Sequence, residues 1–372
     1  MTDVIIIGGG LAGLFNSILL SRAGLSVILF EKKSYPFHRV CGEYISNEVI
    51  PFLESHSLFP VDFEPTHIDE LQLSSTRGKN FTQRLDLGGF GISRYQYDHW
   101  LSKRAIESGV DLRENITVIS TEFKEDHFSV ETKSGNCHSS KIVIGSYGKR
   151  SKLDQTLDRA FLRKKSPYVG VKYHLRTDLP SNRISLHNFN GGYCGISQIE
   201  DQKFNLCYLT HREPLRKFGS IGAFEKAVLS RNPFLKDLLD NAEFLFEKPE
   251  VINEITFEKQ EPLYDHIFMC GDAAGMITPL CGNGMAMAIH SSKILSENIV
   301  QAFDETSFDR SRLEKNYADA WSRQFSTRLW AGQKIQHLFG SGRSSGIGVS
   351  IGKYLRPVSK FLISQTHGQP FN

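Results

Sequence analysis

The sequence predicts an α/β fold: a doubly wound sheet, a second and mainly antiparallel sheet inserted into it, and helices at the C-terminus. The short apolar run Val4–Ile7 leads through a glycine-rich turn and a helical stretch to a second strand at Val27–Phe30, the order expected of a doubly wound domain. Strands then dominate residues 168–210, and another buried strand (266–270) and a long helix (284–303) follow only beyond them. Because these signals lie on both sides of the strand-rich stretch, we expect one domain to be discontinuous and the other to be inserted.

The remaining elements complete this division. Residues 69–92 are expected to form strands, residues 95–108 an amphipathic helix closed by Gly109, and residues 116–145 three strands. A stripe of large apolar side chains at i,i+4 spacing predicts a C-terminal helix packed on the core; its members are Leu313, Tyr317, Trp321, Phe325 and Leu329. The doubly wound domain is predicted to comprise residues 1–68, 93–165 and 262–305. The inserted sheet domain is predicted to comprise residues 69–92 and 166–261, and a C-terminal helical region residues 306–372.

Composition excludes several kinds of partner and site. A formal net charge of +3 gives no reason to expect a nucleic-acid partner. None of the six cysteines forms a C-x-x-C pair and no H-E-x-x-H spacing occurs, so we expect no metal site and reduced thiols in a cytoplasmic protein. The apolar N-terminus carries Asp3 and several glycines, unlike a signal peptide, and no apolar stretch approaches the ~18 residues of a membrane span.

The glycine-rich turn fits the pattern G-x-G-x-x-G at Gly8, Gly10 and Gly13. Gly8 permits a tight turn, Gly10 lets the backbone approach a pyrophosphate, and Gly13 lets the helix pack closely on the strand. The helix begins at Leu11 and Ala12, where free N–H groups and the positive end of the helix dipole would face the phosphates. A turn without a ligand is the alternative, and the strand–turn–helix context argues against it.

An acidic residue supports the dinucleotide interpretation. Glu31 ends the second strand 18 residues after Gly13, with Lys32 beside it. A carboxylate at this place can accept hydrogen bonds from the hydroxyls of an adenosine ribose. This fingerprint alone does not separate NAD from FAD.

A second pair of motifs separates them. Residues 270–275 read C-G-D-A-A-G after a strand, and residues 279–284 read P-L-C-G-N-G before a helix. With these motifs the chain resembles the large family of FAD enzymes that includes aromatic hydroxylases of the p-hydroxybenzoate hydroxylase type, geranylgeranyl reductases and flavin-dependent halogenases. The resemblance covers essentially the whole chain. It implies a Rossmann-like FAD-binding domain with a GR2-type doubly wound sheet, FAD as the cofactor, and the inserted sheet as the substrate domain.

The resemblance also implies which residues hold the cofactor. Gly271 and Asp272 would bind the ribityl chain, and Arg94 stands where the family has an FAD-contacting arginine, although a solvated arginine at a helix start is the alternative. We expect Asp272→Ala to weaken FAD binding more than Asp98→Ala does. The segment along the isoalloxazine would comprise Pro279, Gly282, Asn283, Gly284 and Met285. A helix N-terminus at that place would stabilise the anionic reduced flavin.

Two further segments are candidates for the neighbourhood of the flavin ring. Arg39, Cys41 and Gly42 belong to a stretch that resembles the C-G segment of geranylgeranyl reductases, which passes close to the flavin. Cys41 is thus a candidate thiol beside the ring, and a plain buried cysteine is the alternative. Tyr193, in the G-G-Y-C-G stretch, occupies the place of a substrate-facing strand in the reductases, with a simple β-turn as the alternative. Cys41 and Tyr193 are the candidate catalytic residues, although the flavin itself is expected to carry the chemistry.

The chain departs from the family at Tyr147. Many members carry an A-D-G motif where this sequence has S-Y-G, and the acid has been tied to the use of pyridine nucleotides. We therefore expect weak or slow use of NADPH. Only one glycine-rich fingerprint is present, so no separate nicotinamide-binding domain is predicted, and the reductant is NAD(P)H or an electron-donor protein.

Two reactions remain open, and hydroxylation by a flavin monooxygenase is the favoured one. The abundance of monooxygenases in the superfamily favours hydroxylation of a phenolic or polyketide-like substrate, whereas the C-G segment and the P-L-C-G-N-G loop favour reduction of carbon–carbon double bonds in an isoprenoid. A halogenase is disfavoured because the W-x-W-x-I-P signature is missing. A non-catalytic flavin redox module is disfavoured by the full-length substrate domain.

Either reaction requires a hydrophobic small molecule bound against the flavin. We expect its pocket to be built from the 168–210 sheet and roofed by the C-terminal helices. Four aromatic residues of this stretch are expected to offer it apolar surface: Tyr173, Phe189, Tyr193 and Tyr208.

The adenosine-type fingerprint ending in Glu31 predicts FAD rather than FMN in the purified protein, because FMN has no adenosine for this carboxylate to bind. Denaturation followed by chromatography of the released flavin measures this directly. Recovery of FMN alone would show that the fingerprint has been misread.

Overall fold

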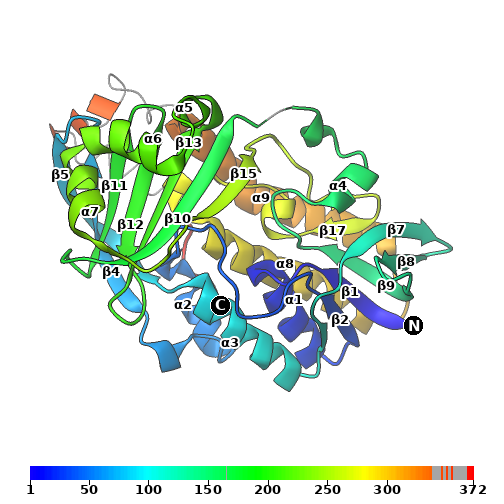
Figure 1. The fold of residues 1–372 in the computed structure, drawn as a ribbon. Coiled ribbons are helices and arrows are strands. Elements are labelled where there is room, and N and C mark those ends of the chain that lie inside the picture. The colour runs from blue at the N-terminus through cyan, green and yellow to red at the C-terminus, as the bar shows by residue number, and fades with distance from the viewer. Residues whose placement is uncertain (165, 337–344, 347–348, 351–352, 355–366) are drawn as a thin grey trace.

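A computed structural model of the chain describes residues 1–164, 166–336, 345–346, 349–350, 353–354 and 367–372. Two β-sheets lie side by side in the molecule, each with its own helices (Figure 1). The first sheet takes strands from residues 2–145 and from residues 263–269, on both sides of several strands of the second sheet. The predicted α/β class with a doubly wound sheet and a mainly antiparallel second sheet is confirmed.

The first sheet has eight strands, and its centre is parallel. The path runs β16-β17-β9-β1-β2-β6, with β7 and β8 attached as antiparallel neighbours of β9. Four parallel pairings, β17–β9, β9–β1, β1–β2 and β2–β6, form its middle. Their continuous apolar sequences suit strands that are buried on both faces. The strands are β1 (Thr2–Ile7), β2 (Val27–Phe30), β6 (Asp111–Arg113), β7 (Val118–Lys124), β8 (His127–Thr132), β9 (Cys137–Gly145), β16 (Leu263–Tyr264) and β17 (Ile267–Met269).

Long helices form the next layer. Helix α1 (Leu11–Arg22) packs against α3 (Arg94–Glu107) and α8 (Gly284–Asp304), and α8 packs in turn against α9 (Arg310–Gln336). The glycine after α3, Gly109, has a φ of +93°, as a C-terminal glycine cap requires. The apolar stripe predicted near the C-terminus lies on α9, and four of its five members are buried, with Leu329 partly buried. Most residues after Gln336 lie outside the described part of the chain, so the predicted helices there are untested.

The second sheet has nine strands in the order β14-β10-β13-β12-β11-β4-β5-β3, with β15 also paired to β10. Only the β11–β4 pairing is parallel. The strands are β3 (Tyr44–Ser46), β4 (Thr66–Ser74), β5 (Asn80–Gly91), β10 (Tyr168–Arg176), β11 (Arg183–Phe189), β12 (Gly192–Gln198), β13 (Phe204–His211), β14 (Glu243–Phe244) and β15 (Glu250–Ile255). Helices α5 (Arg212–Lys217), α6 (Ile221–Ala227) and α7 (Pro233–Asn241) lie over one face of this sheet, called the outer face from here on (Figure 1).

Short helical elements lie between the strands and the longer helices. The α-helices are α2 (Ile50–Ser55) and α4 (Lys152–Thr156), and the 3-10 turns are η1 (Asn47–Val49), η2 (Val61–Phe63), η3 (Ala160–Arg163), η4 (Leu229–Arg231), η5 (Gly271–Ala273) and η6 (Pro279–Cys281). Strand β3 and helices α2 and α5 were not anticipated, because each is too short to show a clear period. Helix α7 was not anticipated either, although its buried residues Leu235 and Leu238 follow helical spacing. The predicted domain boundaries stay a prediction. No helix in the described ranges has the length and apolarity needed to cross a bilayer.

Alternation along the strands divides the second sheet into two faces. On β10 the side chains of Val171, Tyr173 and Leu175 join the apolar core beneath α6 and α7. Lys172 and His174 point to the opposite, inner face, where they meet the segment that follows β2. The inner face is therefore the one turned toward the doubly wound domain.

The packing of α9 generates a stability prediction. Phe325 is fully buried between α9 and α8, whereas Trp330, five residues later on the same helix, is 61% exposed. Phe325→Ala should lower the free energy of unfolding by about 3–5 kcal/mol because it leaves a cavity. Trp330→Ala should change it by less than about 0.5 kcal/mol. Denaturant unfolding of the two variants compares them, and equal losses would contradict this packing.

Candidate functional site

The turn between β1 and α1 needs glycine at two of its three motif positions for reasons of packing. Gly8 has a φ of +105°, and a Cβ there would lie 2.6 Å from the Cα of Tyr147. At Gly13 a Cβ would lie 2.0 Å from the carbonyl oxygen of Gly8. Leu11 and Ala12 are buried in the first turn of the helix. The tight turn and the close approach of helix to strand are thus present in the fold.

Gly10 is different, because the space beside it is open. A Cβ at Gly10 would find one neighbour within 4 Å, the Nη2 atom of Arg94 at 3.6 Å. Gly10 is also the N-cap of α1, and no side chain caps the free N–H groups of that helix. An open space between a helix N-terminus and a guanidinium suits an anionic pyrophosphate.

Glu31 lies at the end of β2 and is 3% exposed. Its carboxylate accepts hydrogen bonds from the backbone N–H groups of Gly9 (2.8 Å) and Lys33 (3.0 Å) and forms an ion pair with Arg39 at 3.2 Å. Glu31 therefore stands beside the glycine-rich turn, as predicted for a ribose-binding carboxylate. The side chain of Lys32 is exposed to solvent.

One buried carboxylate joins the two predicted arginines. Asp98 on α3 accepts hydrogen bonds from Arg94 at 2.6 Å and 2.7 Å and from Arg39 at 3.0 Å. Burial alone would lower the pKa of Arg94, but the adjacent Asp98 carboxylate raises it, so this guanidinium stays charged. Arg94, whose side chain is 12% exposed, is thus a partly buried, oriented cation and not a solvated residue at a helix start. The sequence comparison treated Asp98→Ala as the milder counterpart of Asp272→Ala for FAD binding. Because Asp98 positions both arginines, its removal is expected to affect FAD binding as well.

Asp272 follows Gly271, whose φ is +65° and whose added Cβ would lie 2.9 Å from the Cβ of Ala12. The carboxylate of Asp272 receives no hydrogen bond from the described part of the chain. Burial raises the pKa of Asp272, and the positive charges of Arg94 and Lys149 offset part of this rise. A partly buried acceptor that receives no hydrogen bond suits the hydroxyl groups of a ribityl chain. Lys149, which the sequence analysis did not single out, supplies a second cation beside it.

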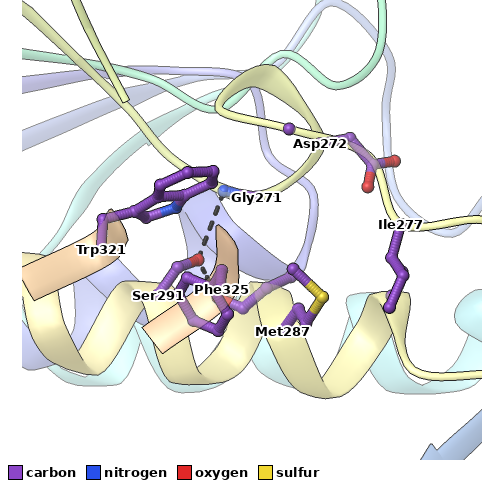
Figure 2. A pocket seen from close by; sticks show the side chains of 10 residues that line it. Gly271, Asp272, Ile277, Met287, Ser291, Trp321 and Phe325 are labelled. Atoms are coloured by element: carbon purple, nitrogen blue, oxygen red, sulfur yellow. Dashed lines mark hydrogen bonds between the residues drawn. The ribbon is translucent and has the colours of Figure 1, made fainter. Parts of the chain in front are cut away.

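Figure 2 shows a small cavity between the loop that follows Gly271 and helices α8 and α9. Met287 and Ser291 line it from α8, and Trp321 and Phe325 from α9. The backbone N–H of Gly271 donates to the Ser291 hydroxyl at 3.3 Å. The side chain of Asp272 is directed away from Trp321, so its carboxylate is turned from the aromatic side of this cavity (Figure 2).

The P-x-x-G-x-G segment begins α8. Gly282 has a φ of +63°, and a Cβ there would lie 3.1 Å from the ring of Tyr44. Asn283 is buried and is the N-cap residue of the helix, and Gly284 and Met285 form its first turn. Pro279, at the other end of the segment, is exposed. The segment thus presents a helix N-terminus without a side-chain cap, as the predicted flavin contact requires.

A buried carboxylate also holds this segment in place. Glu48 is 0% exposed and pairs with Arg328 of α9 at 3.1 Å. The side-chain amide of Asn283 donates to the same carboxylate at 3.4 Å, and the backbone N–H of Gly368 donates to it as well. Glu48 therefore connects the start of α8, helix α9 and the residues near the C-terminus, which are far apart in sequence.

The C-G segment runs over the inner face of the second sheet. The Asn205 amide donates to the Cys41 carbonyl at 3.1 Å, and the Lys172 ammonium donates to the Arg39 carbonyl at 3.1 Å. Cys41 is partly buried and burial raises the pKa of its thiol, whereas Gly42 is exposed with open space beside it. Cys41 therefore lies between the doubly wound domain and the sheet.

Glu43 fastens this segment at three points. Its carboxylate is 0% exposed and accepts hydrogen bonds from Lys172 Nζ (2.5 Å) and the Arg94 backbone N–H (2.8 Å), and its second oxygen lies 2.7 Å from His174 Nε2. Burial would raise the pKa of Glu43, but Lys172 and His174 lower it to about 2. The sequence analysis missed this cluster; a lysine inside the otherwise apolar strand V-G-V-K-Y-H-L was the available signal.

The aromatic residues expected to line the substrate pocket separate onto two faces. Tyr173, Phe189 and Tyr208 belong to the outer core beneath α6, where the hydroxyls of Tyr173 and Tyr208 donate to Glu225. That expectation was wrong for these three, because strand alternation turns them away from the doubly wound domain. Tyr193 faces inward and packs with Leu209 and with Leu280 of the P-x-x-G-x-G segment.

Tyr147, the residue in place of the family's acid, is partly buried beside β17. Its hydroxyl donates to the sulfur of Met269 at 3.3 Å, and burial raises its pKa. It cannot therefore supply a negative charge at neutral pH. Among the described residues no group of histidine, cysteine and acidic side chains is arranged to hold a metal ion.

Comparison with known proteins agrees with this arrangement. The family described as "FAD binding domain" matches residues 1–169. The chain is an FAD-dependent oxidoreductase. It is therefore an enzyme, which overturns the alternative of a non-catalytic flavin module, and FAD is its cofactor.

Relatives of this flavoprotein extend over most of its length. It is 25% identical to conditioned medium factor receptor 1 of Dictyostelium discoideum, over 87% of this chain and 68% of that protein. It is 24% identical to digeranylgeranylglycerophospholipid reductase 1 of Methanopyrus kandleri, over 90% of each. The flavin-dependent brominase Bmp2 superposes with a TM-score of 0.77 at 19% identity, covering 98% of this chain and 93% of that one. At that identity, the structural likeness establishes the fold alone.

The environments of two aspartates predict different effects of mutation. Asp272→Asn should weaken FAD binding roughly 10- to 150-fold, the equivalent of about 1.5–3 kcal/mol for a lost hydrogen bond to a charged group. It should leave the apoprotein as stable as before, because burial already disfavours this carboxylate. Flavin fluorescence titration and calorimetry of the apoprotein measure the two quantities.

Asp98→Asn should lower both FAD affinity and apoprotein stability, the latter by about 3–5 kcal/mol, because Arg39 and Arg94 lose their shared partner. An Asp98 variant with wild-type stability would contradict the proposed positioning of the arginines. An Asp272 variant with unchanged affinity would contradict the ribityl contact.

Proposed function

We propose that FAD lies along the line of residues just described. The observation that carries this proposal is the open space at Gly10, which is faced by the partly buried Arg94 guanidinium. The carboxylate of Asp272, which receives no hydrogen bond from the described part of the chain, lies close enough to Arg94 to feel its charge. The adenosine would bind at Glu31, the pyrophosphate at the N-terminus of α1, and the ribityl chain at Asp272. The isoalloxazine would lie between the N-terminus of α8 and the C-G segment at Cys41.

For the reaction, we infer a reductase that saturates carbon–carbon double bonds in a hydrophobic, isoprenoid-like molecule. Sequence relatives support this over hydroxylation, because several proteins named digeranylgeranylglycerophospholipid reductase align over 88–91% of this chain at 22–25% identity. The structure adds that the C-G segment, the feature shared with reductases, is held firmly against the inner face of the substrate sheet.

Bound FAD supplies the hydride chemistry, and the protein supplies binding, orientation and exclusion of water. Glu43 and Lys172 hold the C-G segment, and Asp98 orients the two arginines. The apolar cluster of Tyr193, Leu209 and Leu280 offers the substrate a dry surface next to the N-terminus of α8. The free N–H groups there would stabilise negative charge on the pyrimidine side of the reduced flavin.

We propose that two electrons come from NAD(P)H only slowly and from an electron-donor protein more readily. Tyr147 supports this, since its buried neutral hydroxyl cannot replace the acid associated with pyridine nucleotide use. Hydroxylation of a phenolic or polyketide-like ring is the second candidate; it draws support from the fold shared with PqsL of P. aeruginosa, whose structure holds 2-aminobenzoylacetate (TM-score 0.77, 16% identity).

The two reactions differ in their need for oxygen. With dithionite as reductant and geranylgeraniol as test substrate, the holoenzyme should saturate at least one double bond under strict anaerobiosis. Mass spectrometry would detect a gain of two hydrogens per bond. The opposite result is incorporation of one ¹⁸O atom from labelled oxygen into a phenolic substrate, with no anaerobic turnover, which would assign the enzyme as a monooxygenase.

A further inference from the structure

The inner face of the second sheet is partly exposed at Gly195 on β12. The pairing register sets Gly195 between Leu186 on β11 and Cys207 on β13. All three residues are partly exposed, whereas their outer-face neighbours on β12, Cys194 and Ile196, are buried. A partly exposed floor thus lies in the middle of the face that is turned toward the doubly wound domain.

The fold does not require glycine at this position. Gly191 has a φ of +91°, and a Cβ at Gly192 would lie 2.0 Å from the Leu209 carbonyl oxygen, so both belong to the tight hairpin. At Gly195 a Cβ would lie 3.5 Å from Leu186 Cδ2 and 3.7 Å from the Cys207 carbonyl oxygen, which are ordinary contacts, and the backbone is not left-handed. The missing side chain therefore serves to leave space above the sheet.

The walls and ends of this space define its chemistry. Leu186 and Cys207 stand on strands two spacings apart, roughly 9.5 Å, so between their side chains there is room for about one hydrocarbon chain. One end meets the apolar cluster of Tyr193, Leu209 and Leu280. The other end approaches Asn205, whose amide holds the Cys41 carbonyl.

Asn205 adds a second, independent sign of a ligand. It is 1% exposed, and its Oδ1 atom has no hydrogen-bond partner in the described protein. A buried acceptor left without a donor costs free energy, which a hydroxyl or N–H group of a bound molecule would recover. The slot thus joins an apolar surface to one unused polar atom.

We propose that Gly195 is a specificity-determining residue, the floor of a slot that admits one isoprenoid chain along β12 between Leu186 and Cys207. This inference rests on the proposed function, because it assumes that the flavin lies beside Cys41 and Leu280. A chain in the slot would pass next to both segments. A fused ring system is wider than the slot and would not reach the floor.

The test is a titration of the oxidised, FAD-loaded full chain with geranylgeraniol, followed by the shift in flavin absorbance, so that no turnover is needed. Gly195→Ala should change the dissociation constant less than about threefold. Gly195→Leu should raise it at least tenfold, with FAD content and the ligand-free flavin spectrum unchanged. Gly222→Leu is the matched control, since a Cβ at this remote glycine meets nothing within 4 Å, and its constant should equal that of the wild type.

Leu186→Phe narrows the same slot from its wall and should also weaken geranylgeraniol binding, which keeps the test decisive if Gly195→Leu misfolds. Wild-type affinity in a folded Gly195→Leu or Leu186→Phe variant overturns the slot. Failure of the wild type to bind geranylgeraniol overturns it too. Binding that the variants abolish, without anaerobic reduction by any form, supports the slot and refutes only the proposed reaction.

Discussion

The buried ion pair between Glu43 and Lys172 is the contact on which the arrangement of the two sheets depends. Both side chains are 0% exposed, so each charge has given up its hydration and relies on the other. Removing one partner alone would leave an isolated buried charge, at a cost of about 3–5 kcal/mol. Because Glu43 also accepts a hydrogen bond from the backbone N–H of Arg94, the same carboxylate connects the second sheet, the C-G segment and the helix that carries the arginine.

Around this contact, charge and apolar surface are sorted by face. The outer face of the second sheet is closed by α5, α6 and α7, and its buried polar groups are satisfied within the protein, as at Glu225. The inner face carries Lys172, His174 and Asn205 toward one end and Tyr193 and Leu209 toward the other. A molecule bound to this face would contact polar side chains at one end and apolar side chains at the other, only a few residues apart along the strands. Such a gradient orients an amphiphilic ligand without a dedicated charged pocket.

Much of this could be predicted from sequence where local chemistry determines structure. The turn at Gly8 and Gly13 and the carboxylate at Glu31 follow from a short motif with a steric or electrostatic reason, and the long helices follow from their apolar period. The role expected of Asp272 follows from the family resemblance. The strand Val27–Phe30 lies where it was expected. These features depend on residues that are close in sequence.

What escaped prediction depends on pairing between distant residues. Strand alternation is visible in Y-V-G-V-K-Y-H-L-R, but nothing local tells which of its two faces meets the cofactor domain, and so Tyr173, Phe189 and Tyr208 were assigned to the wrong one. The partnership of Glu43 with Lys172 spans 129 positions of sequence. The junction at Glu48 is of the same kind: Arg328, Asn283 and Gly368 all meet that single acid. In evolutionary terms, a recombination event that exchanged α9 for that of a distant homologue would separate the acid from its partners, so the C-terminal helix and the loop at Asn283 should be inherited together.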